Sequence, residues 1–153
     1  MSDASDGDQP PPANVRVDDR VGVDGGRWAS LAARVLVDEG MSGDAEMGLL
    51  FVDEDEMTGL NREHMGAEGP TDVLSFPIDG AEAADQGLVG DVVICPAVAT
   101  RQAAEHGVEA DDEMALLVVH GVLHLLGMDH AEAGEAAAMR EREQHHLRRT
   151  VSP

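Results

Sequence analysis

Residues 120–130 read HGVLHLLGMDH, and this segment carries most of the information that the sequence holds about function. His120 and His124 are four residues apart, so a helix places both imidazoles on one face, one turn apart. Gly127 follows where the helix needs a left-handed stop, which lets the chain turn back and bring His130 to the same point. Three neutral imidazoles without a fourth protein ligand are typical of a catalytic zinc that keeps one position open for water.

Three other interpretations of this segment can be weighed from the sequence. A core helix that happens to carry histidines fits poorly with this spacing and with the glycine at the bend. A structural zinc usually closes its shell with cysteines, and Cys95 is the single cysteine. The zinc-protease pattern H-E-x-x-H-x-x-G-x-x-H matches except at Gly121, where that pattern has its general-base glutamate. Because glycine cannot accept a proton, the metal geometry is retained while peptide hydrolysis is disfavoured.

Three blocks upstream accompany the histidine segment: Leu60-Asn61, then GPTDVLSFP at residues 69–77, and LVGDVVIC at residues 88–95. Together and in this order, they closely resemble the YbeY family of bacterial rRNA-maturation endoribonucleases. The resemblance runs from about residue 27 to about residue 147. It implies a zinc-dependent, single-strand-specific endoribonuclease that acts in 16S rRNA 3′-end processing and in ribosome quality control.

The resemblance also assigns ligands and partners. It implies one Zn²⁺ per chain, held by His120, His124 and His130, and a substrate of single-stranded RNA or rRNA. It implies the ribosome or ribosomal proteins as partners, whereas neither DNA nor a membrane is expected. Asp129 either orients a ligand histidine or is only a turn residue. Thr71, Asp72 and Ser75 of the family's signature loop are expected to line the cleft. For Thr71 and Asp72, an equal alternative is that they are only turn residues after Pro70.

One position departs from the family. Many members carry an arginine, thought to serve catalysis or RNA contact, where this chain has Met65. Arg62 lies one helical turn earlier on a similar face, and it is our candidate catalytic residue in place of that arginine. A cation from elsewhere in the chain and a lower intrinsic activity are equally admissible alternatives.

The charge of the chain limits how it can bind RNA. The formal net charge is −21, and all ten basic residues are arginine. This acidity excludes binding through a broad positive field, so local cations must suffice: the zinc, Arg62, Arg101 and the C-terminal arginines. It also leaves open a second function class, a ribosome-assembly or RNA-binding factor whose zinc is mainly structural.

The remaining histidines have no metal spacing relative to the trio, and we expect them on the surface: His64, His106, His145 and His146. Arg148 and Arg149 follow the last two and form a candidate weak RNA-contact patch. No apolar run is long enough for a membrane span, and nothing suggests a signal peptide. A single cysteine is consistent with a reducing interior, so a cytoplasmic location is expected.

Composition and periodicity predict one compact α/β (α+β) domain over residues 15–149, after a disordered acidic, Pro-rich tail over residues 1–14. The predicted order is βαβαββααα, which gives a small sheet of about four strands covered by about five helices. The family resemblance implies that this sheet is mixed. Strands are expected near residues 15–23, 48–52, 73–78 and 88–94. Helices are expected near residues 27–39, 54–65, 96–106, 111–126 and 131–147, the last of them packing loosely.

Overall fold

The computed structural model describes residues 14–78, 87–128 and 133–151. The predicted order βαβαββααα is confirmed in this part of the chain. The strands are β1 (Asn14–Asp19), β2 (Glu46–Phe51), β3 (Val73–Pro77) and β4 (Leu88–Ile94). The helices are α2 (Gly25–Asp38), α3 (Glu54–Met65), α5 (Pro96–His106), α6 (Ala110–Leu125) and α7 (Ala133–Val151). The tail predicted over residues 1–14 lies outside the described residues except for Asn14, which begins β1.

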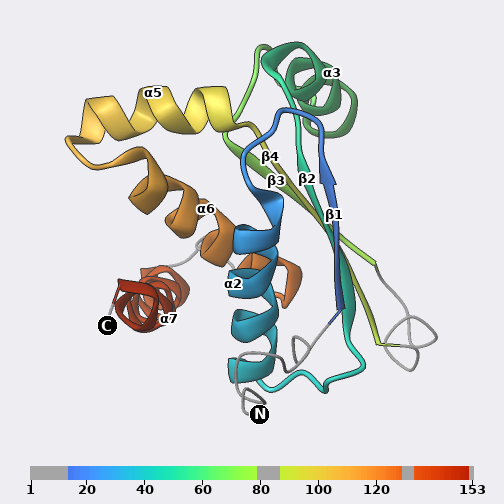
Figure 1. Cartoon of the computed structure of the whole chain (residues 1–153), viewed down its shortest axis with the longest axis vertical. Helices are drawn as coiled ribbons and strands as arrows, with labels where there is room; N and C mark the ends of the chain where they lie inside the picture. Colours follow the sequence, from blue (N-terminus) through green and yellow to red (C-terminus); the bar gives the residue numbers. More distant parts are fainter. Residues whose placement is uncertain (1–13, 79–86, 129–132, 152–153) are drawn as a thin grey trace, which may run out of the picture.

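The four strands form one mixed sheet in the order β1-β2-β4-β3. Strands β1, β2 and β4 run parallel, whereas β3 pairs antiparallel with β4 at the sheet edge, with Ser75 opposite Val92. An edge position suits β3 because Pro77 has no N–H to donate to a further strand. Helices α2, α6 and α7 lie on one side of this sheet (Figure 1).

Alternating residues of the strands contribute their side chains to two apolar clusters, one on each face of the sheet. Val92 and Ile94 belong to the larger cluster, in which α2 and α6 pack on the sheet. Val93 and Cys95 belong to a smaller cluster, which α3 supplies with the fully buried Met57. Cys95 is fully buried as a small apolar core residue, and burial raises the pKa of its thiol.

Helix α6 is the central helix of the domain. It contacts α2, α5 and α7 as well as β3 and β4, and its buried residues lie on several sides of the helix. Gly127 follows it at φ 95°, the left-handed stop that the sequence predicted. The histidine-bearing end of α6 is therefore held firmly against the sheet.

Two expectations for the ends of the domain were wrong. The first strand stops at Asp19, because the carboxylate of Asp19 accepts backbone N–H bonds from Gly22 (2.7 Å) and Val23 (2.9 Å) and so turns the chain. The last helix does not pack loosely, since Met139 is 2% exposed and His146 is 1% exposed.

Among the described helices, none is both long enough and apolar enough to cross a membrane.

Candidate metal site and cleft

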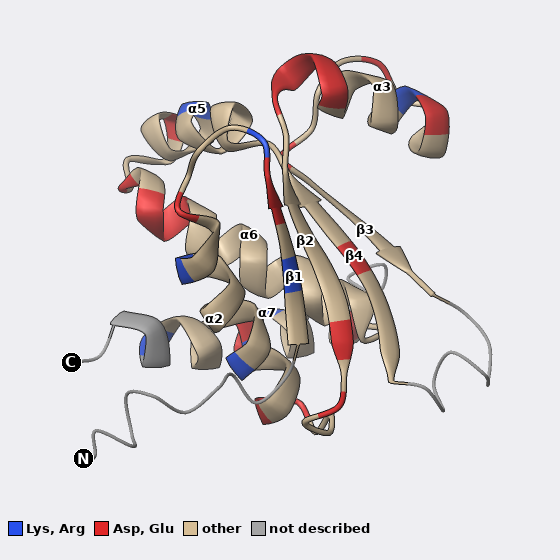
Figure 2. Ribbon diagram, turned by 45° about the vertical axis from the view of Figure 1, so that its right-hand side comes forward, with Lys and Arg blue, Asp and Glu red and all other residues tan. Residues whose placement is uncertain are grey.

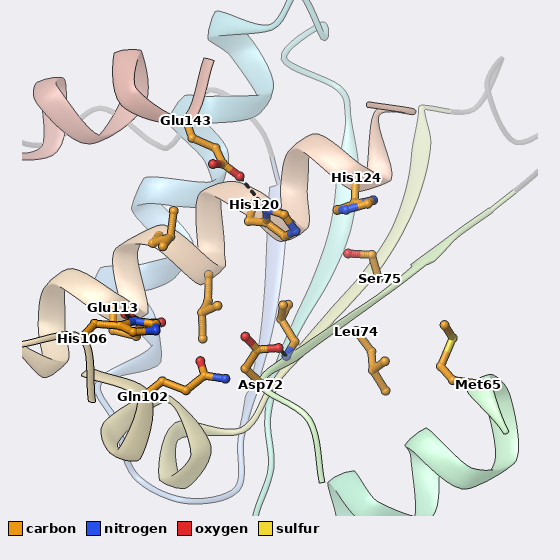
Figure 3. Close-up of a pocket in the computed structure, with 13 residues that line it drawn as sticks. Met65, Asp72, Leu74, Ser75, Gln102, His106, Glu113, His120, His124 and Glu143 are labelled. Carbon is orange, nitrogen blue, oxygen red and sulfur yellow. Dashed lines mark hydrogen bonds and ion pairs between the residues drawn. The ribbon is translucent and has the colours of Figure 1, made fainter. Parts of the chain in front are cut away.

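A cleft of about 510 Å³ opens beside α6. Its walls come from β3, α5, α6 and α7, with Met65 of α3 at its edge (Figure 3). The lining residues are Met65, Asp72, Val73, Leu74, Ser75, Gln102, His106, Glu113, Leu116, Leu117, His120, His124 and Glu143. Two segments that the sequence singled out, the 69–77 block and the histidine helix, therefore share one cavity.

His120 and His124 both face this cleft from α6, as their spacing predicted. Their ring centroids are 4.7 Å apart with an interplanar angle of 62°, and the His120 side chain is 28% exposed. The third predicted ligand, His130, lies outside the described residues, as does Asp129. The structure thus brings two of the three predicted zinc ligands together at the wall of a cleft.

Glu143 of α7 orients the first of these histidines. Its Oε2 lies 2.5 Å from His120 Nδ1, and the residue is only 8% exposed. Because a buried carboxylate accepts the Nδ1 proton, the imidazole is fixed in orientation and Nε2 is left as its ligand atom. Sequence reasoning missed Glu143. The available signal was its spacing from Met139 and Leu147, which places it on their apolar face of α7.

The donor set fits a zinc ion. Imidazole nitrogens backed by a carboxylate are the arrangement in which zinc-binding histidines are usually held. The backbone under them is fixed as well, since Ser75 Oγ donates to the Gly121 carbonyl at 3.0 Å. A Cβ at Gly121 would lie 2.6 Å from Val92 Cγ1. A protease-type glutamate at that position would therefore meet the sheet instead of the cleft.

The opposite end of the cleft is acidic and hydrogen-bonded within itself (Figure 3). Glu113, 4% exposed, is 3.3 Å from His106 Nδ1. With its amide nitrogen turned toward the carboxylates, Gln102 donates to Glu113 (3.2 Å) and to Asp72 (3.1 Å). Asp72 also accepts from the Val73 N–H at 2.7 Å. These side chains connect α5, α6 and the start of β3.

The other predicted residues are distributed as follows. Asp72 and Ser75 line the cleft, but Thr71 does not. Arg62 is exposed on α3 and is not among the lining residues, whereas Met65 is 64% exposed and lines the cleft edge. Arg148 is exposed on α7.

His146 was expected on the surface, and this was wrong. Its Nε2 lies 2.6 Å from Glu39 Oε2 of α2, and its Nδ1 lies 3.8 Å from Asp38. Arg142 also binds Glu39, with Nε at 2.8 Å. Burial alone would raise the pKa of Glu39, but the hydrogen bonds from His146 and Arg142 outweigh it and hold that pKa below its usual value. This network docks α7 on the end of α2.

Ligand atoms of Asp38, His145 and His146 lie within 4.8 Å of one another, so these residues form a second group with metal-ligand chemistry. The guanidinium of Arg142, 2.6 Å from Glu39, stands beside this group. A fixed positive charge opposes a second cation so close to it. The ion-pair network is therefore the better account of this cluster.

The chain is similar in sequence and in fold to known proteins. The family model described as Endoribonuclease YbeY matches residues 16–151. A relative from Salinispora tropica, named Endoribonuclease YbeY, is 45% identical over 139 residues, covering 82% of this chain and 88% of the relative. One of the same name from Beutenbergia cavernae is 46% identical, covering 78% and 83%. The solution structure of TM1509 from Thermotoga maritima matches with a TM-score of 0.64 and 27% identity, over 88% of this chain and 87% of that one.

Proposed function

The chain belongs to the endoribonuclease YbeY family, and from that premise we propose that it uses zinc to cleave single-stranded RNA during maturation of the 16S rRNA 3′ end. As a member of this family it is a hydrolase that acts on phosphodiester bonds of RNA, with a role in rRNA processing. The finer assignments are the proposal: the metal, the strand specificity, the cleavage region and a part in ribosome quality control.

The observation that carries the proposal is the contact between Glu143 and His120 at the wall of the cleft. A buried carboxylate that fixes one imidazole beside a second is a typical support for a catalytic zinc ligand. We assign the zinc to His120, His124 and His130. When bound, zinc supplies a Lewis acid that polarises a phosphate oxygen and lowers the pKa of water.

The residues of the chain itself perform the binding and positioning. Glu143 holds the His120 ring through its Nδ1–H, and Ser75 fixes the α6 backbone at Gly121. The apolar side chains of Leu74, Leu116 and Leu117 line the cleft. Such walls suit the faces of an unpaired nucleotide, whose bases are free to enter a cavity. This supports a preference for single-stranded RNA.

The test is cleavage of a single-stranded RNA and of its duplex, with and without a chelator, by wild type, His120→Ala and His64→Ala. His64 is the matched control, because it is exposed and does not line the cleft. We expect His120→Ala to lose both zinc and cleavage while it keeps its circular dichroism spectrum. Equal cleavage by wild type and His120→Ala would indicate a contaminating nuclease and overturn the assignment.

A second candidate, an RNA-binding ribosome-assembly factor with a mainly structural zinc, is favoured by two observations. Met65 supplies no positive charge at the cleft edge, and the far end of the cleft carries Asp72 and Glu113. In that case RNA would bind without being cut, and removal of zinc would lower the thermal midpoint without changing RNA integrity. A casein assay tests the less favoured zinc metallopeptidase, for which Gly121 supplies no base.

The partners and location follow from the same proposal. The substrate is single-stranded RNA or rRNA, presented on the ribosome or by ribosomal proteins, which places the chain in the cytoplasm. Arg62 remains a candidate for RNA contact at the surface of α3, outside the cleft. Sedimentation of the protein with ribosomal subunits on a sucrose gradient tests the ribosomal partner.

A further inference from the structure

His120 stands between two hollows. The larger is the cleft described above, and the smaller, of about 410 Å³, lies on the α7 side. The smaller hollow is lined by His120, Ala136, Met139, Arg140 and Glu143. Any ligand held at His120 is therefore next to an arginine of α7.

The two hollows differ in charge. The larger cleft contains the carboxylates Asp72 and Glu113 at the end away from His120. Among the described residues that line the smaller hollow, Glu143 is the one carboxylate and is bound to His120, while Arg140 adds a positive charge. Since like charges repel, a chain of phosphates that passes His120 is favoured on the α7 side.

Arg140 is available for this task, unlike most arginines of the described chain. Arginines elsewhere are bound to carboxylates of the protein: Arg16, Arg20, Arg27, Arg101 and Arg142. Arg140 is exposed and forms no ion pair with a described residue. Acidic segments are spread over most elements and basic ones are few (Figure 2), so an arginine beside His120 that has no carboxylate partner among the described residues matters for a polyanion.

We propose that the hollow lined by Arg140 is a phosphate subsite, which holds the RNA phosphate adjacent to the one being cleaved. The guanidinium donates two parallel hydrogen bonds to two phosphate oxygens, a bidentate geometry that arginine provides and lysine does not. The RNA backbone then crosses His120 along α7, while a base enters the larger cleft. This subsite rests on the proposed function, because it assigns the path of the same RNA substrate.

The test measures binding, so that it does not depend on turnover. Fluorescence anisotropy with a short single-stranded RNA carrying 2′-O-methyl riboses and phosphorothioate links gives Kd across a salt series, with intactness checked on a gel. The variants are Arg140→Gln, Arg140→Lys and the matched control Arg16→Gln. The Arg16 side chain is 72% exposed on β1, and Arg16 is absent from the residues lining either hollow at His120.

We expect Arg140→Gln to raise Kd about threefold to tenfold. Its slope of log Kd against log salt should fall by about 0.7, the loss of one phosphate contact. Arg140→Lys should keep the slope but weaken binding, and Arg16→Gln should change neither the slope nor Kd. Equal Kd values and equal slopes for Arg140→Gln and Arg16→Gln would overturn the subsite. If the wild type cleaves RNA and Arg140→Gln binds RNA as tightly as the wild type, only the subsite is overturned. If the wild type neither binds nor cleaves RNA, the proposed function is overturned.

Discussion

Glu143 Oε2 lies 2.5 Å from His120 Nδ1, and this contact makes the geometry of the candidate zinc site depend on the docking of α7. The same helix carries Arg142 and His146, which bind Glu39 at the end of α2. One face of α7 therefore supports His120, a candidate metal ligand, while the adjacent side chains hold the helix in place. We therefore expect the metal affinity to depend on the packing of α7.

Removing the carboxylate of Glu143 should weaken zinc binding without unfolding the protein. Loss of the group that orients a ligand histidine typically costs about 10- to 100-fold in metal affinity. We expect that loss for Glu143→Ala and a smaller one for Glu143→Gln, whose amide oxygen still accepts from Nδ1. Competition with a fluorescent zinc chelator measures it.

Glu141→Gln is the control for this experiment, because Glu141 is exposed on the same helix and has no interaction with the described residues. Its zinc affinity should equal that of the wild type. An unchanged affinity in Glu143→Ala would show that the His120–Glu143 contact is only a packing feature.

Local signals in the sequence predicted most of the fold. Aspartate is a common N-cap residue, and the Asp53 side chain accepts the Glu56 N–H at 2.8 Å at the start of α3. Proline is typical of edge strands and of the first turn of a helix, where Pro77 and Pro96 lie. Gly127 ends α6, as predicted. Each of these features depends on a few neighbouring residues, so its physical cause is visible in the sequence.

The parts that were missed depend on charged pairs between distant segments. Glu143 and His120 are 23 residues apart, and His146 and Glu39 are 107 apart. Burial of a charged side chain is stabilised by its partner, and neither partner marks the other in the sequence. For this reason α7 was expected to pack loosely and His146 to lie on the surface.

A side chain at Gly121 should destabilise the protein, because α6 approaches β4 closely there. A Cβ would lie 2.6 Å from Val92 Cγ1 and 3.3 Å from Val73 Cγ2. We expect Gly121→Ala to lower the free energy of unfolding by about 1–3 kcal/mol, the usual cost of overpacking. Chemical denaturation measures this.

Gly59→Ala is the matched control, since a Cβ at Gly59 in α3 meets nothing within 4 Å. Alanine there should be neutral or stabilising by up to about 1 kcal/mol, because it favours the helix. Equal stabilities of Gly121→Ala and Gly59→Ala would contradict the close contact between α6 and β4.

The stability supplied by Glu39 should depend on pH. His146 and Arg142 hold the pKa of this carboxyl below its usual 4.5. A lowered pKa in the folded state gives stability that is complete above the unfolded value and is lost as pH falls through the folded value. Glu39→Gln should therefore destabilise the protein at neutral pH, by about 1–3 kcal/mol, and the difference from wild type should shrink in acid below 4.5.

Urea denaturation across a pH series checks this, with Glu105→Gln as the control. Glu105 is exposed on α5 and has no interaction with the described residues. If the difference in free energy of unfolding between the wild type and Glu39→Gln stays constant with pH, Glu39 acts through packing and not through its charge.

Met65→Arg should increase RNA affinity. Met65 is 64% exposed at the edge of the cleft, at the position where the family resemblance places an arginine. An arginine there adds a phosphate contact at the edge of the larger cleft, so Kd should fall about threefold to tenfold. The slope of log Kd against log salt should become steeper by about 0.7.

Val108→Arg is the matched control, because Val108 is also an exposed apolar residue, 43% exposed, and does not line the cleft. Both variants change the net charge equally, so an equal gain from the two would assign the effect to long-range charge and not to the cleft edge.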